Sequence, residues 1–481
     1  MEHKNTVIHW FRQDLRLIDN PALFEATQKQ NVLPIYILDD VNSKEHMMGS
    51  ASRWWLHKSL DNLSNGLEGN LGLYVGNPEE VLDKLISKYN IKKIYWNRCY
   101  EPWRIKRDKD LKLNLENKGV EVNTYNGSLL WEPWEINKSD GTPYKVFTPY
   151  YRKGCLNAPA PRDPLPRIAT QAIFSDDENE IKLEDLKLLP KIKWYEDMEE
   201  IWVPGEEGAE VKVNTFISNG LLDYKEGRNF PAKKNVSQLS PYLHFGEISP
   251  NQIWHRAKFE ESRSGIENSL NHFLSELGWR EFSYSLLYNF PTLPKENLQK
   301  KFDKFPWIKN EEFLERWQQG KTGYPIVDAG MRELWQTGYM HNRIRMVVGS
   351  FLVKNLLLHW HQGERWFWDC LIDADLASNS ASWQWVAGCG ADAAPYFRIF
   401  NPITQGVKFD SEGEYTKKYL PELKDLPNKY LFNPWEAPEE VLKKANIILG
   451  EDYPFPIVDI KESREKALDA FATTKLEQIE P

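Results

Sequence analysis

The sequence predicts two domains: an N-terminal α/β domain built on a doubly wound parallel sheet, and a larger, all-α C-terminal domain. Three observations support this. The chain has 481 residues, which is long for one ordinary hydrophobic core. Short apolar runs alternate with helical segments over the first 130 residues. After about Trp194 the apolar residues recur mainly at three- and four-residue spacing. We therefore expect an α/β domain over residues 1–130, a connector over 131–200 and a helical domain over 201–481.

Strands and helices alternate in the first domain. Asn77 and Pro78 indicate a helix start, because asparagine caps free amide groups and proline suits the first helical position. No GxGxxG pattern follows the first apolar run, so the usual dinucleotide fingerprint is absent. We expect buried strands at Thr6–Phe11, Val32–Leu38, Leu71–Val75 and Ile94–Trp96, and helices at Ser52–Leu63 and Pro78–Tyr89.

A proline-rich segment predicts the connector, which we expect to cross a surface. It contains Pro159, Pro161, Pro164 and Pro166, and the acidic stretch Asp176–Glu180 follows it. Beyond the connector, apolar residues at helical spacing predict helices at Ser269–Tyr288, Val327–Gly338, Asn342–His359 and Glu364–Leu371.

Composition narrows the class of protein. Hydrophobic residues make up 41% and charged residues 27%, which is ordinary for a globular chain. No apolar run is long enough for a membrane span, and the polar start argues against secretion. The four cysteines form no CxxC pair, so we expect free thiols in a reducing cytoplasm and no metal site. A net charge of −9 argues mildly against nucleic-acid binding over the whole surface but leaves room for a local basic groove.

The densest group of chemically useful residues lies between Thr337 and Gln405. Asp373, Asp375, Asn379, Trp383 and Trp385 fall close together among small residues, which allow a flat ligand or another helix to approach the backbone. Two acids beside an asparagine suit a polar heterocycle. A buried helix junction with two caps explains the same pattern, and composition alone slightly favours that simpler interpretation.

Two trios at helical spacing are further candidates. Glu276, Trp279 and Arg280 share one helix face and could receive a base with a polar edge, although a surface ion pair beside a core tryptophan is equally ordinary. Asn342, Arg343 and Met346 form a similar trio. His341 alone is more often a structural residue. Arginines that are scattered in sequence matter only if the fold gathers them: Arg228, Arg280, Arg343 and Arg398.

No hydrolytic triad, nucleophile elbow, phosphate loop or metal-spaced cluster occurs in the sequence. If the chain is an enzyme, a cofactor must supply the reactive chemistry.

Several longer motifs carry a specific resemblance. The opening VIHWFRQDLRLIDNPAL is followed by YKVFTPYYR, QLSPYLHFGEIS, ELGWREF, GKTGYPIVDAGMREL, TGYMHNRIRM and SWQWVAGCGADAAPYFRIFNP. Together, in this order and over nearly the whole chain, they resemble the photolyase and cryptochrome family. YEPWR and DADLASNSASWQW resemble a branch near plant cryptochromes that also contains bacterial repair enzymes acting on cyclobutane pyrimidine dimers.

The resemblance implies FAD bound in a bent shape within the helical domain. Arg345 and Asp373 would flank the isoalloxazine, and Asp375 would lie at its polar edge. Asn379 would face the flavin N5, where an amide can hydrogen-bond to a protonated, reduced flavin and so suits repair better than signalling. The other residues expected around the cofactor or the substrate mouth are Tyr224, Ser237, Ser240, Glu276 and Arg280.

The resemblance also implies an electron relay from the flavin to the surface through Trp383, Trp360 and Trp307, although core packing explains each of them individually. A flipped-out dimer would rest on Trp279 and Trp385. Glu276 and Asn342 would bind its polar edges, and Met346 would pack against it. The residues expected at DNA phosphates are Arg228, Arg280, Arg343, Arg398 and Gln405.

Three departures from the family pattern affect these expectations. Val236–Ser237 replaces a common Thr-Ser pair, so one phosphate contact is lost. Tyr100–Arg104 stands where some relatives bind a folate antenna through an Asn–Glu pair. The resemblance implies a second, antenna chromophore. Folate, deazaflavin and another flavin all remain open, and so does the absence of an antenna. The chain also stops soon after the helical domain, without the long tail of signalling cryptochromes.

The implied function is light-driven repair of cyclobutane pyrimidine dimers in DNA, by electron transfer from photoexcited reduced FAD to the flipped-out dimer. Such an enzyme is a deoxyribodipyrimidine photolyase, a carbon–carbon lyase, and we expect a monomer without membrane contact. One alternative is a blue-light photoreceptor. Another is a six-four photolyase, although Asn342 stands where those enzymes have a histidine, which favours the cyclobutane substrate. A third is a flavoprotein that merely binds single-stranded DNA.

Overall fold

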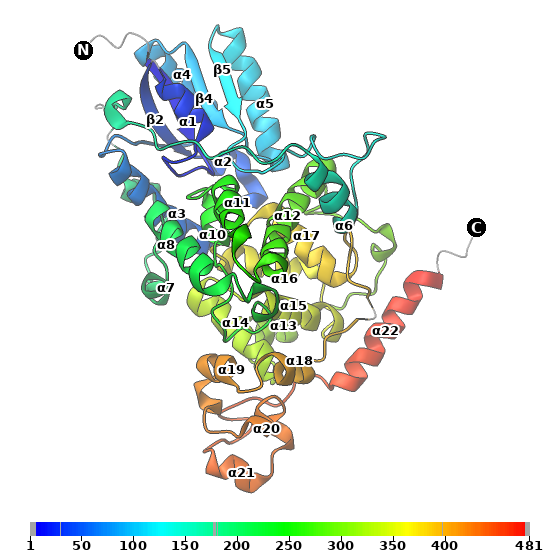
Figure 1. Cartoon of the computed structure of the whole chain (residues 1–481). Helices are drawn as coiled ribbons and strands as arrows, with labels where there is room; N and C mark the ends of the chain where they lie inside the picture. Colours follow the sequence, from blue (N-terminus) through cyan, green and yellow to red (C-terminus); the bar gives the residue numbers. More distant parts are fainter. Residues whose placement is uncertain (1–5, 29, 177–178, 180, 397, 477–481) are drawn as a thin grey trace. The chain divides into compact units, whose positions relative to one another are not determined.

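The computed structural model describes residues 6–28, 30–176, 179, 181–396 and 398–476 (Figure 1). Residues 177, 178 and 180 of the predicted acidic stretch and the polar residues 1–5 lie outside this range. The chain forms two compact units. Unit 1 contains residues 1–222, 237–291 and 372–377, and unit 2 contains residues 223–236, 292–371 and 378–481.

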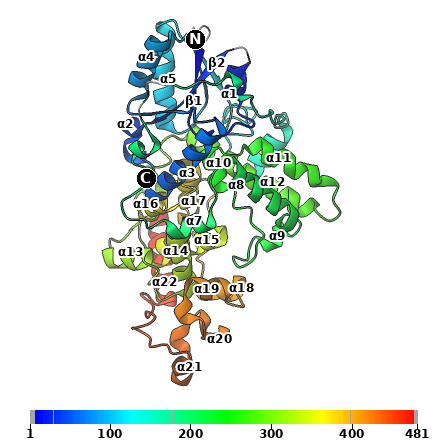
Figure 2. The same cartoon turned by 90° about the vertical axis from the view of Figure 1, so that its left-hand side faces the viewer.

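A five-stranded sheet lies in unit 1 (Figures 1 and 2). All of its strand pairs are parallel and their order is β3-β2-β1-β4-β5, which confirms the predicted doubly wound sheet. The strands are β1 (Thr6–Phe11), β2 (Asn31–Leu38), β3 (Gly72–Val75), β4 (Lys93–Asn97) and β5 (Glu121–Tyr125). The sequence did not predict β5, which lies at the sheet edge and carries the polar residues Glu121, Asn123 and Thr124.

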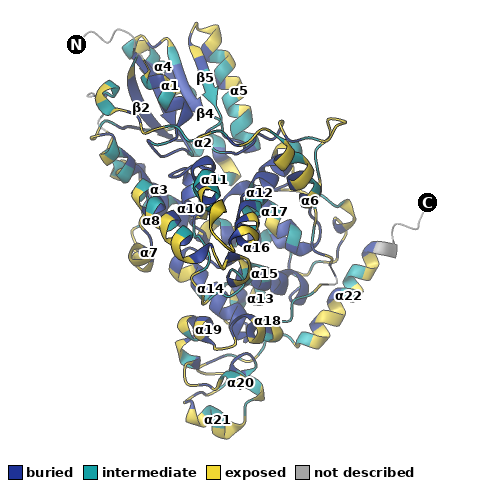
Figure 3. Ribbon diagram, viewed as in Figure 1, coloured by how far each residue is buried: buried dark blue, intermediate teal, exposed yellow. Residues whose placement is uncertain are grey.

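Helices α4 and α5 pack against the sheet through apolar side chains. Leu82 and Leu85 of α4 and Leu111 and Leu115 of α5 pack with Ile8, Trp10, Ile35 and Ile94 of the strands in one buried cluster. Burial of this kind is the main driving force for the layer. Helix α1 packs on β1 and β4 and buries Leu23 and Ala26. Figure 3 shows the strands as predominantly buried.

The predicted start of α4 is confirmed. Asn77 accepts a hydrogen bond from the backbone N–H of Glu79, and Pro78 opens the helix. The helices of unit 1 are α1 (Pro21–Thr27), α2 (Asp40–Ser43), α3 (Ser50–Gly66), α4 (Pro78–Tyr89), α5 (Pro102–Asn117), α6 (Phe147–Pro149), α7 (Glu196–Ile201), α8 (Glu206–Thr215), α10 (Ser240–Phe245), α11 (Pro250–Phe259) and α12 (Glu267–Asn289).

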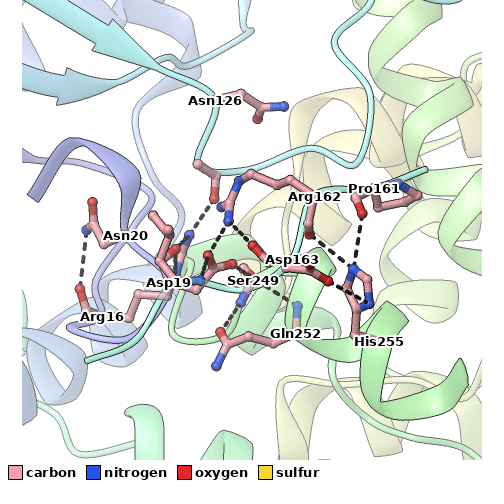
Figure 4. A network of polar contacts seen from close by, with 12 residues as sticks. Arg16, Asp19, Asn20, Asn126, Pro161, Arg162, Asp163, Ser249, Gln252 and His255 are labelled. Carbon is pink, nitrogen blue, oxygen red and sulfur yellow. Dashed lines mark hydrogen bonds and ion pairs between the residues drawn. The ribbon is translucent and has the colours of Figure 1, made fainter. Parts of the chain in front are cut away.

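A buried polar network after β1 joins three segments of unit 1 (Figure 4). The Asp19 carboxylate is fully buried, pairs with Arg162 and accepts hydrogen bonds from Ser249 Oγ and, at 2.8 Å, from the backbone N–H of Leu165. Arg16, also buried, donates to the carbonyl oxygens of Asp19, Gly127 and Gly246. The turn after β1, the proline-rich segment and the start of α11 are thereby held in one place.

Unit 2 is helical. Its helices are α9 (Tyr224–Gly227), α13 (Glu311–Gln318), α14 (Pro325–Thr337), α15 (Asn342–Ser350), α16 (Trp360–Cys370), α18 (Pro402–Phe409), α19 (Glu414–Tyr419), α20 (Asn428–Leu431), α21 (Glu439–Lys444) and α22 (Ile460–Leu476), and most of α17 (Leu376–Ala387). The prediction of one helix over Asn342–His359 is wrong: α15 ends at Ser350, a wider π turn spans Phe351–Asn355, and Leu357 has φ +52°. The apolar residues keep their helical spacing through this segment, but the backbone does not continue as an α-helix.

Two findings bear on the environment of the protein. Over the described residues no helix is both long and apolar enough to cross a membrane. Cys99, Cys155, Cys370 and Cys389 are all buried free thiols.

Gly246 gives a stability prediction. Its φ is +71°, and a Cβ there would lie 2.1 Å from the carbonyl oxygen of Gln13. Gly246→Ala should therefore lower the free energy of unfolding by more than the about 1–3 kcal/mol typical of backbone strain alone. Gly119→Ala is the matched control, because Gly119 has φ +80° with nothing within 4 Å of the added Cβ. Urea denaturation of both variants measures the difference, and equal losses would contradict the close approach.

Candidate active site

Helix α12 presents the first predicted trio. Trp279 stacks on Phe147 with ring centroids 3.8 Å apart and is half-buried. The Glu276 side chain is 29% exposed and lies 3.7 Å from the ring of His272, one turn earlier. A flat ring and a carboxylate thus share an accessible helix face, as the spacing predicted. Next to them, a Cβ on Gly278 would lie 2.5 Å from the ring of Tyr151, so glycine is required for this close packing.

Two buried carboxylates of unit 1 receive hydroxyl donors. Ser240 Oγ donates to Asp373 at 2.6 Å, and the Tyr284 hydroxyl donates to Asp375 at 2.5 Å. Burial and the charge of Asp375 raise the pKa of Tyr284, so the phenol stays protonated and remains a donor. His244 Nδ1 lies 3.8 Å from Asp375. These contacts fix the orientation of both carboxylates in unit 1.

The Arg280 side chain is mostly buried. Its side chain is 14% exposed and donates to Glu281 at 2.9 Å, and its guanidinium carbon lies 5.0 Å from the centre of the Tyr284 ring. Glu281 in turn accepts from the backbone N–H groups of Leu130 and Trp131. The Arg280 guanidinium is thus held by Glu281 and packs against Tyr284. Sequence reasoning missed Tyr284, although it follows Arg280 by four residues on the same face.

Asn379 of unit 2 has a fixed amide. Its Nδ2 donates to the backbone carbonyl of Glu364 at 3.1 Å, which leaves Oδ1 as the acceptor end of the group. Ser380 Oγ donates to the Glu364 carboxyl at 2.5 Å, and burial raises the pKa of Glu364 to about 7. Glu364 therefore holds two consecutive residues of α17. No sequence pattern indicated this role of Glu364.

The start of α15 carries the second predicted trio. Asn342 is exposed and Met346, one turn later, is half-buried. Arg343 donates to Asn229 Oδ1 at 2.5 Å and lies over the Phe409 ring at 4.3 Å. His341 caps the helix by accepting from the backbone N–H of Arg343, which confirms the structural interpretation of this histidine.

The fold gathers several arginines near His341. Burial, together with the nearby charges of Arg228, Arg343 and Arg345, lowers the pKa of His341 to about 3. Arg345 Nε also donates to the Met340 carbonyl at 2.7 Å. A cluster of cations around a neutral histidine is suited to anions.

The remaining predicted residues of unit 2 occupy varied positions. Tyr224 is buried with Arg228 5.3 Å from its ring centre, and Gln405 is half-buried in α18. Arg398 is exposed, and its carbonyl accepts from Lys354 Nζ at 3.0 Å. In unit 1, Ser237 is half-buried and accepts from the backbone N–H of Leu239 at 3.4 Å.

The predicted relay tryptophans all lie in unit 2. Trp383 is buried and packs against Phe367 and Trp317, with ring centroids 5.0 and 6.3 Å away. Gly363 is required beside it, because a Cβ there would lie 2.1 Å from the Trp383 ring. Trp360 is fully buried and Trp307 is half-buried. Trp385 is half-buried, and the neighbouring Gln384 is tied to the carbonyls of Leu293 and Glu296.

Comparison with known proteins identifies the family. Residues 7–169 match the family described as DNA photolyase, and residues 273–473 match the FAD-binding domain of DNA photolyase. The chain belongs to the DNA photolyase family. It is 48% identical to a deoxyribodipyrimidine photo-lyase of Agrobacterium fabrum over 98% of both chains, and 39% identical to cryptochrome-2 of Arabidopsis thaliana over 99% of this chain and 80% of that one. The crystal structure of a class III photolyase from Agrobacterium tumefaciens matches with a TM-score of 0.93 at 47% identity, over 98% of each chain.

The side chains of this photolyase-family member fit FAD. A flavin presents one ring N–H, carbonyl oxygens and a hydroxyl-rich ribityl chain. In unit 1, Asp373 and Asp375 are fixed acceptors of the kind that suits N–H and hydroxyl groups. In unit 2 considered by itself, Asn379 Oδ1 is an acceptor of the kind that suits a protonated ring nitrogen. Arg345 supplies a cation. Over the described residues, no group of three or more histidine, cysteine, aspartate or glutamate residues could hold a metal ion.

A separate pocket lies in unit 1 beyond the carboxyl ends of β1 and β2, next to the point where the strand order reverses. Open α/β sheets commonly bind ligands at such a point. Arg107 pairs with Asp39 at 2.8 Å and lies over the rings of Trp10 and Trp103. The pocket thus combines aromatic rings with arginines. Its lining includes Trp103 and Arg104, which belong to the segment Tyr100–Arg104 that lacks the Asn–Glu pair.

Glu364 gives a pH prediction. Its pKa is raised from 4.5 to about 7, so between these values the folded protein keeps a proton that the unfolded chain has released. Stability contributed by this group is full below about pH 4.5 and is lost as the pH rises to about 7, with a total of about 3 kcal/mol. Glu364→Gln should therefore reduce the decline of unfolding free energy over this range.

The control is Glu312→Gln, which changes an exposed carboxyl on α13. Urea denaturation at several pH values compares the three proteins. A slope in Glu364→Gln equal to that of the wild type would show that Glu364 ionises normally in the folded state.

Proposed function

We propose that this protein is a light-driven lyase that repairs cyclobutane pyrimidine dimers in DNA. The observation that carries the proposal is its 48% identity with a deoxyribodipyrimidine photo-lyase over 98% of both chains. The fixed amide of Asn379 supports it, because an acceptor suits a protonated, reduced flavin. Bound FAD supplies the photoexcitable electron donor, and the protein supplies binding, orientation and exclusion of water.

Glu276, Trp279, Asn342, Met346 and Trp385 bind the flipped-out dimer in this proposal. Trp279, supported from behind by Phe147, offers a flat apolar surface for stacking. Glu276 and Asn342 are accessible polar groups on α12 and α15 that can pair with the carbonyl and imide edges of the dimer. A site that hydrogen-bonds those edges rejects lesions that leave its polar groups unpaired.

The cofactor is held by Tyr224, Ser237, Ser240, Arg345, Asp373, Asp375 and Asn379 in this proposal. The hydroxyls of Ser240 and Tyr284 fix the two carboxylates before any ligand binds, so little reorganisation is needed. We also assign Arg280 to this group, because its charge points toward Tyr284 and Glu281.

DNA phosphates are contacted by Arg228, Arg343, Arg398 and Gln405 in this proposal. The arginine cluster around His341 supports a local basic surface on a chain whose net charge is −9. The aromatic and cationic pocket beside β1 and β2 is the proposed place for an antenna chromophore, whose class can be identified by extraction and mass spectrometry. We further propose a monomer that works in the cytoplasm, with antenna, connector and catalytic domains at 1–130, 131–200 and 201–481.

A blue-light photoreceptor is the second candidate function, and the observation that favours it is 39% identity with cryptochrome-2 of Arabidopsis thaliana. A repair assay discriminates between the two. The reduced protein is mixed with oligonucleotides that carry either a cyclobutane dimer or a six-four photoproduct, in light and in darkness. Our proposal requires light-dependent repair of the cyclobutane dimer. Repair of neither lesion would favour the photoreceptor, and repair of only the six-four lesion would favour a six-four photolyase.

Glu276 and Asn342 should affect repair differently. Asn342→Ala should weaken dimer binding by about 1–3 kcal/mol, because a buried edge of the dimer loses its partner. Glu276→Ala should also lower repair per photon at saturating substrate, because its carboxyl can stabilise the charge that develops on the dimer. Neither change should alter FAD content. Binding titrations and repair yields measure these effects, and full repair by saturated Glu276→Ala would remove Glu276 from the chemistry.

Arg343 should contribute to the salt dependence of DNA binding. Each phosphate contact adds roughly −0.9 to the slope of log affinity against log salt for duplex DNA. Arg343→Ala should flatten the slope by about that amount for damaged and undamaged DNA alike. Arg464→Ala, at an exposed position on α22, makes the same change of charge and should leave the slope unaltered. Identical slopes in wild type and Arg343→Ala would place Arg343 outside the interface.

A further inference from the structure

Two of the relay tryptophans share a histidine neighbour. The ring of His359 lies 5.3 Å from the ring of Trp307 and 5.6 Å from that of Trp360, between centroids. Its plane is nearly parallel to the Trp360 indole, at 27°, and inclined at 61° to Trp307. His361 contacts Trp360 from a centroid distance of 3.8 Å. His359 is therefore in ring contact with both tryptophans.

Hydrogen bonds fix these rings and their protons. His359 Nδ1 accepts from the backbone N–H of His361, so a neutral His359 carries its proton on Nε2. The Trp360 indole N–H donates to Asn297 Oδ1 at 2.9 Å, and the Asn297 amide donates to Asp303 at the same distance. An amide oxygen is a very weak base, so an oxidised Trp360 would find no good proton acceptor there and would keep its positive charge.

His359 is suited to lie beside such a charge because it is itself neutral. Burial, together with the nearby His361 and Arg365, lowers its pKa to about 4. A protonated imidazole in contact with both indoles would repel positive charge on either of them. A neutral imidazole instead offers a polarisable ring between them.

The backbone around His359 is constrained. Leu357 has φ +52°, which is strained for a residue with a bulky side chain. The Ile308 N–H donates to the Leu357 carbonyl at 3.0 Å, and a parallel bridge joins Ile308 to Leu358. Ile308 follows Trp307 and Leu358 precedes His359, so this bridge sets the spacing between the two rings.

We propose that His359 is a positioning and bridging residue that couples Trp360 to Trp307 during photoreduction. The inference rests on the proposed function, together with the relay through Trp383, Trp360 and Trp307 that the family resemblance implies. In the step concerned, one electron moves from Trp307 to oxidised Trp360, which restores the Trp360 indole and leaves the positive charge on the half-buried Trp307. A thiol in solution then gives one electron to Trp307, releases a proton and becomes a thiyl radical.

Two substitutions separate the ring of His359 from its role as a helix cap. His359→Asn keeps a capping acceptor for α16 but removes the ring. His359→Phe keeps a ring but removes the cap. Trp307→Phe blocks the last step and provides the reference for charge that stops at Trp360. His361→Asn is the matched control, because His361 contacts Trp360 but its ring contacts do not include Trp307 among the described residues.

The measurement is transient absorption and electron paramagnetic resonance of the tryptophan radicals after a flash on the flavin-loaded protein. In His359→Asn the Trp360 radical should persist several-fold longer than in the wild type and approach the behaviour of Trp307→Phe. His359→Phe and His361→Asn should stay near the wild type. Wild-type kinetics in His359→Asn, or slowing in His359→Phe equal to that in His359→Asn, would overturn the proposal.

Two further results keep failure of this inference distinct from failure of the proposed function. If Trp360→Phe leaves the radical signals unchanged, these tryptophans are not the relay, whatever His359 does. The relay takes no part in repair by chemically reduced protein. The repair assay therefore tests the proposed function independently of the relay. Without flavin, nuclear magnetic resonance of the His359 ring should show a neutral Nε2–H tautomer at neutral pH, and a protonated ring would overturn the bridging role.

Discussion

The buried carboxylate of Asp19 is the interaction on which the arrangement of unit 1 depends. It is fully removed from water, so its charge must be met by Arg162, Ser249 and the Leu165 amide (Figure 4). Removing a partner would leave this buried charge poorly compensated and would destabilise the fold. The partners come from the proline-rich segment and from the start of α11. The carboxylate therefore holds the proline-rich segment and the start of α11 at the turn after β1.

Hydrogen bonds within the protein also orient the buried polar side chains that are proposed to bind the cofactor. Ser240 and Tyr284 orient Asp373 and Asp375 in unit 1, and Glu364 orients Asn379 in unit 2. Each buried polar group has its orientation set by the protein, which is how a site is prepared for a ligand at little cost on binding. The position of the His359 ring is likewise set by the protein, through the strained backbone at Leu357 and the bridge between Ile308 and Leu358. In the proposed relay, this ring lies beside the tryptophans that transfer the electron.

The sequence predicted the parts of the fold that have strong local signals. β1 and α4 have the predicted boundaries, because an apolar run and an Asn-Pro start each determine structure locally. β5 was missed because Glu121–Tyr125 is half polar, and the break after Ser350 was missed because apolar spacing does not report backbone strain. Asp373 and Asn379 stood out in the sequence, and the family resemblance added Ser240. The contact of Ser240 with Asp373 and the role of Glu364 beside Asn379 were not predicted. Ser240 lies 133 residues from Asp373, so only the folded chain reveals that contact.

In the proposed function, light drives splitting of the dimer with no net change in the cofactor, while the protein binds and orients dimer and cofactor and shields them from water. The most direct measurement counts dimers split per flash by reduced, substrate-saturated protein and follows the absorption of the reduced flavin in the same sample. The account predicts repair that continues over many flashes with the flavin still reduced at the end, in the wild type and in Trp383→Phe alike. Loss of one reduced flavin for each dimer split, or no splitting of cyclobutane dimers in light, would contradict it.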